Sequence, residues 1–166
     1  MENLLMRKKK LGQELYEHRE NVIVFYKTGD DFGIFSNFYS SGIYAQGKYW
    51  PTVEHYFQAQ KFCNELIKEK IRKFSSPMDA AKEGRSRNNK LREDWEKVKD
   101  NVMRFAVLEK FKQNDDARAI LLSTENHLII EHTVNDNYWG DGGDGSGKNM
   151  LGTILMETRE LLSSSN

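Results

Sequence analysis

The sequence of 166 residues contains little cysteine and little proline. Its one cysteine, Cys63, excludes an intramolecular disulfide and favours a reducing compartment. No activating environment is evident around Cys63, so we expect a small buried side chain inside a helix rather than a nucleophile. With only two prolines, the chain offers few breaks in its longer periodic segments.

An excess of charge of either sign is also missing. Lys and Arg together number 25, and so do Asp and Glu. A neutral total gives no general attraction to nucleic acid or to an anionic membrane. The basic run Arg7–Lys10 lies near the N-terminus, where we interpret it as a solvated arm.

Long hydrophobic runs are absent. No stretch approaches the ~18 apolar residues that a membrane-spanning helix needs, and the N-terminus has no uncharged apolar segment. Hydrophobic residues still make up 38% of the chain, enough for one core without metal or disulfide support. We therefore expect a cytoplasmic protein that has no membrane partner.

The hydrophobic pattern predicts an α+β fold, a mostly α-helical single domain with a few short strands. Strands are predicted at 22–26 and 128–130, and a hairpin at 43–49 around Gln46-Gly47. Helices are predicted over 53–64 with a continuation to 74, then over 77–84, 92–113, 115–122 and 150–162. Residues 1–21 are interpreted as an N-terminal extension without a catalytic role, 22–162 as the domain and 163–166 as a tail.

One helix start combines polar side chains on a single face. Pro51 and Thr52 mark the start, so Glu54 falls in the first turn, where the helix dipole favours a carboxylate. Glu54, Gln58 and Lys61 share a face by their spacing and would suit a polar ligand. The alternative is a glutamate that complements the dipole on a solvated face. His55 points to another face and is interpreted as structural.

Two later segments add cationic and aromatic side chains. Arg85 and Arg87 follow a predicted helix end and could bind a phosphate through bidentate hydrogen bonds. The alternative interpretation is a solvated loop. The loop of residues 131–141 includes Asp136 and Trp139, which suit a sugar hydroxyl and a flat heterocycle. Its alternative interpretation is an irregular connection held by Asx turns.

The glycine-rich segment from Gly142 to Asn149 almost matches a phosphate-binding P-loop. Asn149 occupies the position where a P-loop has the hydroxyl of Ser or Thr, and no apolar strand precedes the segment. We therefore reject a nucleoside triphosphatase. The segment is still consistent with a glycine-rich turn whose backbone amides approach a ligand. The four histidines and single cysteine show no metal-ligand spacing, so no metal is expected.

Six separated blocks of residues follow one another in an order that resembles the NADAR family. The resemblance covers about residues 22–162. The blocks are Ser36-Asn37-Phe38; Trp50-Pro51-Thr52 with Glu54-His55, Phe57-Gln58-Ala59 and Lys61; Ala81 with Gly84-Arg85; Trp95; Glu131, Thr133, Asp136 and Trp139-Gly140; and Gly147, Asn149 and Leu151-Gly152.

The resemblance implies a hydrolase that needs no cofactor and cleaves a C–N glycosidic bond. The implied substrates are amino-pyrimidine phosphoribosides, which are early intermediates of riboflavin biosynthesis, and the products are ribose 5-phosphate and a free pyrimidine. One alternative is removal of ADP-ribose from guanine bases, the only nucleic-acid partner we expect. Another is a non-catalytic module that binds NAD or ADP-ribose. The sequence leaves the oligomeric state open.

The resemblance also implies roles for individual residues. Glu54 is expected to be the main catalytic carboxylate and Asp136 the second carboxylate or a ribose-orienting group, although the reverse assignment stays open. By spacing alone Trp95 belongs to the core face of its helix, so its site role comes from the resemblance. The expected substrate-binding residues are Trp95 and Trp139 for the ring, Arg85, Lys61 and Lys148 or Arg87 for the phosphate, and Asn37, Gln58 and Asn149 for hydrogen bonds.

Overall fold

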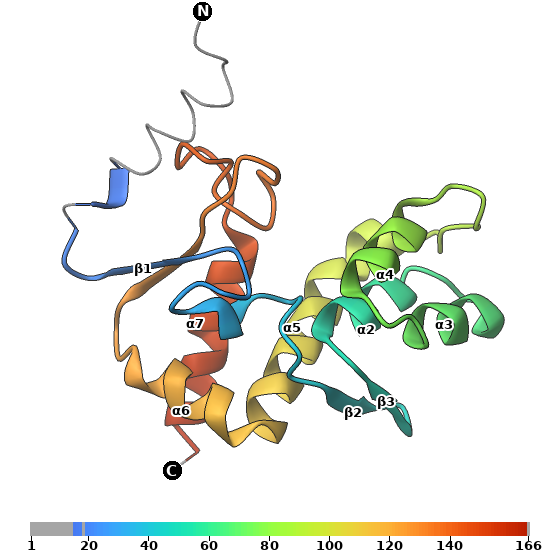
Figure 1. Ribbon diagram of the computed structural model, residues 1–166, viewed down its shortest axis with the longest axis horizontal. Helices are drawn as coiled ribbons and strands as arrows, with labels where there is room; N and C mark the ends of the chain where they lie inside the picture. Colours follow the sequence, from blue (N-terminus) through green and yellow to red (C-terminus); the bar gives the residue numbers. More distant parts are fainter. Residues whose placement is uncertain (1–14, 18, 166) are drawn as a thin grey trace, which may run out of the picture. The chain divides into compact units, whose positions relative to one another are not determined.

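The computed structural model describes residues 15–17 and 19–165, and these form two compact units (Figure 1). One unit contains the described residues up to Ser36 and those from Ala119 onward. The other unit is the continuous segment Asn37–Arg118. Most of the predicted N-terminal arm, including Leu11, lies outside the described residues.

The first unit is built on two parallel strands. β1 (Val22–Phe25) pairs with β4 (Leu128–Glu131), with Ile23 opposite Ile129. The 3-10 turn η1 (Gly33–Phe35) follows β1 in the sequence, and its three residues are buried. The ring of Phe35 packs edge-on against the ring of Phe25. Helix α7 (Met150–Ser163) packs against β4 (Figure 1). The core of this unit contains the buried apolar side chains of both strands and of α7, which are Ile23, Phe25, Ile129, Ile130, Leu151, Ile154 and Leu155.

Helix α7 is joined to β4 at its first turn. Asn149 has a left-handed backbone, with φ of 51°. Its Nδ2 donates to the carbonyl of Ile129 at 2.9 Å, and its Oδ1 accepts the N–H of Glu131 at 3.0 Å. A Cβ on Gly152 would lie 2.1 Å from the Ile129 oxygen, so α7 reaches this position only with glycine there.

The second unit begins with the predicted hairpin, which is confirmed. β2 (Ile43–Ala45) pairs antiparallel with β3 (Lys48–Trp50). Gln46 and Gly47 connect them with φ of 54° and 74°, as a tight hairpin turn requires.

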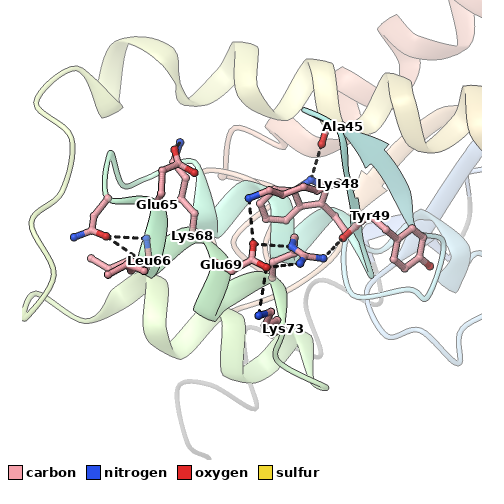
Figure 2. Close-up of polar contacts among 12 residues, drawn as sticks. Ala45, Lys48, Tyr49, Glu65, Leu66, Lys68, Glu69 and Lys73 are labelled. Atoms are coloured by element: carbon pink, nitrogen blue, oxygen red, sulfur yellow. Dashed lines mark hydrogen bonds and ion pairs between the residues drawn. The ribbon is translucent and has the colours of Figure 1, made fainter.

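An ion network joins the hairpin to helix α3 (Glu65–Arg72), as Figure 2 shows. The Glu69 carboxylate accepts from Arg72 and from Lys48 Nζ at 3.2 Å, while Lys73 Nζ lies 3.6 Å away. Arg72 also donates to the carbonyl of Tyr49 at 3.1 Å. Hydrogen bonds from Arg72 and Lys48 outweigh desolvation and lower the pKa of Glu69 to about 2.

Three helices of this unit, α2, α3 and α4, begin at side-chain caps. Helix α2 (Val53–Ala59) starts at Thr52, which accepts the N–H of His55, and α3 starts at Asn64, which accepts two N–H groups. Ser76 caps α4 (Pro77–Arg85), with proline in its first turn as predicted. α5 (Trp95–Gln113) and α6 (Asp115–Ser123) follow.

Helix α2 is the centre of the second unit. It packs against α3, α4 and α5, and each of its residues is buried. His55 is fully buried, with Nδ1 2.8 Å from Thr52 Oγ1 and Nε2 2.9 Å from the Phe74 carbonyl. The structural interpretation of His55 is confirmed.

Three sequence-based expectations for this unit are wrong. The helix predicted over 53–64 ends at Ala59, because Asn64 caps a separate helix. Cys63 therefore lies in the connecting turn and is exposed, not buried within a helix. The spacing of apolar residues in the predicted helix 92–113 also places Phe105 on its core face. Phe105 is instead 42% exposed, and the buried residues of α5 include Met103, Ala106, Val107 and Phe111.

The predicted fold class is confirmed: helices dominate the described residues, and the strands are short. Within the described part of the chain, no helix has the length and hydropathy needed to cross a membrane.

Candidate active site

Helix α2 and the turn that follows it hold the predicted polar group Glu54, Gln58 and Lys61. Glu54 is in the first turn of the helix and is only 8% exposed, while Gln58 and Lys61 are 6% and 9% exposed. The alternative interpretation, a glutamate on a solvated face, is wrong because α3, α4 and α5 cover this helix. A buried carboxylate needs a functional or structural partner, since desolvating a charge is costly.

Gln58 binds Glu54 directly. Its Nε2 donates to Glu54 Oε1 at 2.6 Å, which fixes the orientation of the carboxylate. Helix α4 leaves room for this amide, because a Cβ on Gly84 would lie only 1.9 Å from Gln58 Oε1. That same oxygen is buried and has no hydrogen-bond partner among the described residues. It is therefore a buried acceptor that the described residues leave unsatisfied.

Asn37 lies against the start of α2. Its carbonyl accepts the N–H of Glu54 at 3.1 Å, and its Nδ2 lies 3.5 Å from the sulfur of Met103. Asn37 Oδ1 is a second buried acceptor without a partner in the described part of the chain. The start of α2 thus has two unsatisfied amide oxygens, one on Gln58, which binds the Glu54 carboxylate, and one on Asn37, whose main chain binds the Glu54 N–H.

Lys61 lies between two aromatic rings. Its Nζ is 5.9 Å from the ring centroid of Phe57 and 5.9 Å from that of Trp95, and the two rings are 5.1 Å apart. Burial lowers the pKa of Lys61 to about 8; Arg87 and Arg85 add to this decrease, and Glu54 opposes it. Lys61 is therefore mostly charged at pH 7 and loses its charge in mildly alkaline solution.

Arg85 and Arg87 add exposed cations to this group. Arg85 is in the last turn of α4, and Arg87 donates to the carbonyl of Gly84 at 3.2 Å. Both guanidinium groups act electrostatically on Lys61. The second unit thus brings together six predicted residues: Asn37, Glu54, Gln58, Lys61, Arg85 and Trp95.

The other predicted residues belong to the loop between β4 and α7 in the first unit. Asp136 Oδ1 accepts the N–H groups of Tyr138 and Trp139, each at 2.8 Å. This is the Asx turn of the alternative interpretation, and both of its hydrogen bonds use the same carboxylate oxygen of Asp136. Trp139 packs edge-on against Tyr138 at 5.0 Å, and Lys148 Nζ lies 5.1 Å from the Tyr138 ring.

Asp136 lines a hollow of about 400 Å³ on this loop. Asn149 does not line it, and both amide atoms of Asn149 bind the backbone of β4. The geometry therefore gives Asn149 a structural role and does not support its predicted hydrogen bond to substrate. The lining residues are Val134, Asn135, Asp136, Asn137, Gly142 and Ser146.

A larger hollow of about 750 Å³ lies in the second unit around Cys63, Ile67 and residues 88–94. None of the predicted site residues lines it. In addition, the described residues include no group of three His, Cys, Asp or Glu side chains placed to hold a metal ion.

Sequence reasoning missed three residues that shape these groups. The Phe57 ring packs beside the ammonium group of Lys61. Its place in the second of the blocks that resemble the NADAR family could have indicated a role in the site. Gly84 was interpreted only as a helix end, whereas it makes room for Gln58. Asp141, which organises the loop of the first unit, had no distinguishing signal among the neighbouring acidic residues.

The sequence is similar to those of known proteins over most of the chain. The NADAR domain family matches residues 24–163. The N-glycosidase YbiA of Escherichia coli (strain K12) is 56% identical over 144 residues, which are 87% of this chain and 90% of that protein. The riboflavin biosynthesis protein PYRR, chloroplastic, of Zea mays is 40% identical over 165 residues, covering 90% of this chain and 26% of that protein.

A solved structure agrees with these matches. The NMR structure of the E. coli protein YbiA has a TM-score of 0.82 and 55% identity, covering 88% of this chain and 87% of that one. Both compact units lie mainly within the segment that the domain family matches. The family-like blocks of the sequence and the family match thus agree, and the chain belongs to the NADAR family.

Proposed function

We propose that the protein is an N-glycosidase that hydrolyses the C–N glycosidic bond of early riboflavin-biosynthesis intermediates. The substrates are amino-pyrimidine phosphoribosides, and the products are ribose 5-phosphate and the free pyrimidine. Two names support this proposal: the relative YbiA is an N-glycosidase, and the relative PYRR is a riboflavin biosynthesis protein.

The reaction needs a group that stabilises the positive charge that develops on the sugar. As the bond between the anomeric carbon and nitrogen breaks, its electron pair leaves with the pyrimidine nitrogen and the ribose becomes oxocarbenium-like. Water then supplies the oxygen for the anomeric carbon, and its proton balances the departing nitrogen. A buried carboxylate stabilises the cation and accepts the proton of the attacking water.

The observation that carries the proposal is the buried carboxylate of Glu54, which the Gln58 amide holds in place. Gln58 Oε1 and Asn37 Oδ1 are acceptors without partners among the described residues. Ribose hydroxyl groups and an exocyclic amine are hydrogen-bond donors, the kind of group that both acceptors lack. We assign Glu54 as the catalytic carboxylate and Gln58 as the group that holds it in place.

The cations beside Glu54 suit the phosphate. Lys61 is buried between Phe57 and Trp95, whereas Arg85 and Arg87 are exposed. We propose that the buried Lys61 contacts the phosphate with its ammonium group, and that the two exposed arginines make bidentate hydrogen bonds to it. The roles of Asp136, Trp139 and Lys148 in substrate contact stay predictions, supported by the resemblance to the family.

The test supplies purified protein with three kinds of substrate. These are the diaminopyrimidinone phosphoriboside, the aminouracil phosphoriboside and an ADP-ribosylated guanosine, with products followed by mass spectrometry. The proposal expects ribose 5-phosphate from one or both pyrimidine substrates. Release of ADP-ribose alone would instead identify an ADP-ribosyl hydrolase. Tight ligand binding without release of either sugar would identify a binding module.

A further inference from the structure

Asp141 is the centre of the hydrogen bonds that hold the loop between β4 and α7. Its side chain is buried, and Oδ1 accepts the N–H groups of Thr133 at 3.0 Å and Gly143 at 2.8 Å. Oδ2 lies 2.7 Å from His132 Nδ1. The main chain of Asp141 also accepts the N–H of Gly147 at 2.8 Å. One carboxylate thus joins both sides of this loop.

The fourth side-chain partner of Asp141 comes from the N-terminal extension. Tyr16 donates its hydroxyl to Asp141 Oδ2 at 3.0 Å, and its ring packs edge-on against His132 with centroids 5.5 Å apart. Burial and then the Asp141 carboxylate raise the pKa of Tyr16, so its hydroxyl keeps its proton and stays a donor. Tyr16 precedes the segment that the domain family matches, 24–163.

A glycine on the loop allows this approach. Gly145 has φ of +82°, and a Cβ there would lie 2.6 Å from Leu15 Cδ2 and 3.6 Å from the Tyr16 hydroxyl oxygen. The Tyr16 hydrogen bond therefore joins residue 16 to the loop, and Gly145 brings the loop backbone close to the Leu15 side chain. Residues 1–21 are interpreted above as an extension without a catalytic role, and Tyr16 shows that this extension nevertheless contacts the loop.

The loop that Tyr16 reaches also contains Asp136. The N–H of Gly142, next to Asp141, donates to the carbonyl of Asp136 at 3.0 Å, and both residues line the hollow of about 400 Å³. We propose that Tyr16 is a positioning residue, which orders this loop through Asp141 and keeps Asp136 in place for substrate binding. The proposal depends on the proposed N-glycosidase function for its kinetic part.

The expected effect follows from the population of the ordered loop. Without the Tyr16 hydroxyl, Asp141 loses one donor, and the loop spends less time in the arrangement that binds substrate. Apparent affinity falls in proportion to the population of the competent state, whereas saturating substrate restores the ordered loop. Because a hydrogen bond to a charged group is among the stronger ones, we expect a rise in KM of about tenfold with kcat nearly unchanged.

The experiment compares Tyr16→Phe with the wild-type chain. Tyr44→Phe is the matched control, because Tyr44 is 70% exposed on the hairpin of the second unit. Amide hydrogen exchange by NMR reports on Thr133 and Gly143, whose N–H groups bind Asp141, and on α7 as an internal reference. Steady-state kinetics on the pyrimidine phosphoribosides separates KM from kcat.

In Tyr16→Phe, we expect faster exchange at Thr133 and Gly143, unchanged exchange in α7, and the tenfold rise in KM. Unchanged exchange at both amides would overturn the proposal, and so would faster exchange with an unchanged KM. A lower kcat at constant KM would overturn it too. If wild type releases no product, the proposed function fails, and the exchange data alone decide whether Tyr16 orders the loop.

Discussion

Gln58 donates a hydrogen bond of 2.6 Å to the carboxylate of Glu54, one helical turn away on α2. The pair is buried, so neither side chain is free to exchange this contact for water. The other oxygen of the Gln58 amide has no partner among the described residues. Gln58 thus holds the carboxylate with one polar atom, while its other polar atom is a buried acceptor packed beside Gly84 of α4.

Gly84→Ala is expected to disturb this pair without unfolding the protein. The new Cβ would meet Gln58 Oε1 at 1.9 Å, so the Gln58 side chain must move away from its present position. Misplaced catalytic groups cost about tenfold to 100-fold in rate, and we expect kcat/KM to fall within that range. The gain in helix propensity of about 1 kcal/mol offsets part of the strain, so thermal unfolding should change little.

Kinetics and calorimetry on the same preparations check this prediction. Met78→Ala is the control, because Met78 is 46% exposed on the same helix. A Gly84→Ala enzyme with wild-type kcat/KM would show that the position of Gln58 does not matter for turnover.

The charge of Lys61 predicts a pH dependence of substrate binding. Burial lowers its pKa to about 8, so the ammonium group that would bind the phosphate is lost as the pH rises through 8. KM for a phosphorylated substrate should therefore rise between pH 7 and pH 9. Lys61→Met should bind weakly at both pH values, and the exposed Lys97→Met should behave as wild type. A kcat that increases through pH 8 at constant KM would contradict the phosphate role.

His55 predicts a loss of stability in acid. Burial lowers its pKa below 6.5, although the hydrogen bond to the Phe74 carbonyl opposes this. The unfolded chain then binds a proton more readily than the folded one, so the stability is complete above pH 6.5 and falls as the pH drops through the folded-state pKa. Urea unfolding at pH 7.5 and pH 5 measures this effect, whose slope is at most about 1.4 kcal/mol per pH unit for one group.

The variant His55→Gln isolates the contribution of this histidine. It should be less stable at pH 7.5, because it loses the contacts to Thr52 and Phe74, and its stability should vary less between the two pH values. Equal acid sensitivity in wild type and variant would assign the effect to other groups.

Gly152→Ala tests how α7 is joined to β4. The added Cβ would lie 2.1 Å from the Ile129 carbonyl oxygen and 2.3 Å from Asn149 Nδ2, so helix and strand must separate. Overpacking of this kind lowers the free energy of unfolding by about 1–3 kcal/mol. Gly29→Ala is the control, because nothing lies within 4 Å of the position of its Cβ. Urea midpoints that are equal for the two variants would contradict this account.

Local sequence signals predicted the elements and part of the site. Thr52 located the start of α2, and Gln46-Gly47 located the hairpin turn, because both depend on neighbouring residues only. The burial of Glu54 and the role of Gly84 depend on how α4 packs on α2, which no local pattern encodes. The bond from Tyr16 to Asp141 joins residues 125 apart in the sequence, beyond the reach of any periodicity.

The most direct test of the account is the rate of ribose 5-phosphate release by wild type and Glu54→Gln in a single turnover. The amide replaces the carboxylate with the same shape, so binding of the pyrimidine phosphoriboside, measured by calorimetry, should change by only a few fold. We predict that the release rate falls by about 100-fold or more, because the charge that stabilises the oxocarbenium ion is lost. Release at the wild-type rate would contradict the assignment of Glu54 as the catalytic carboxylate.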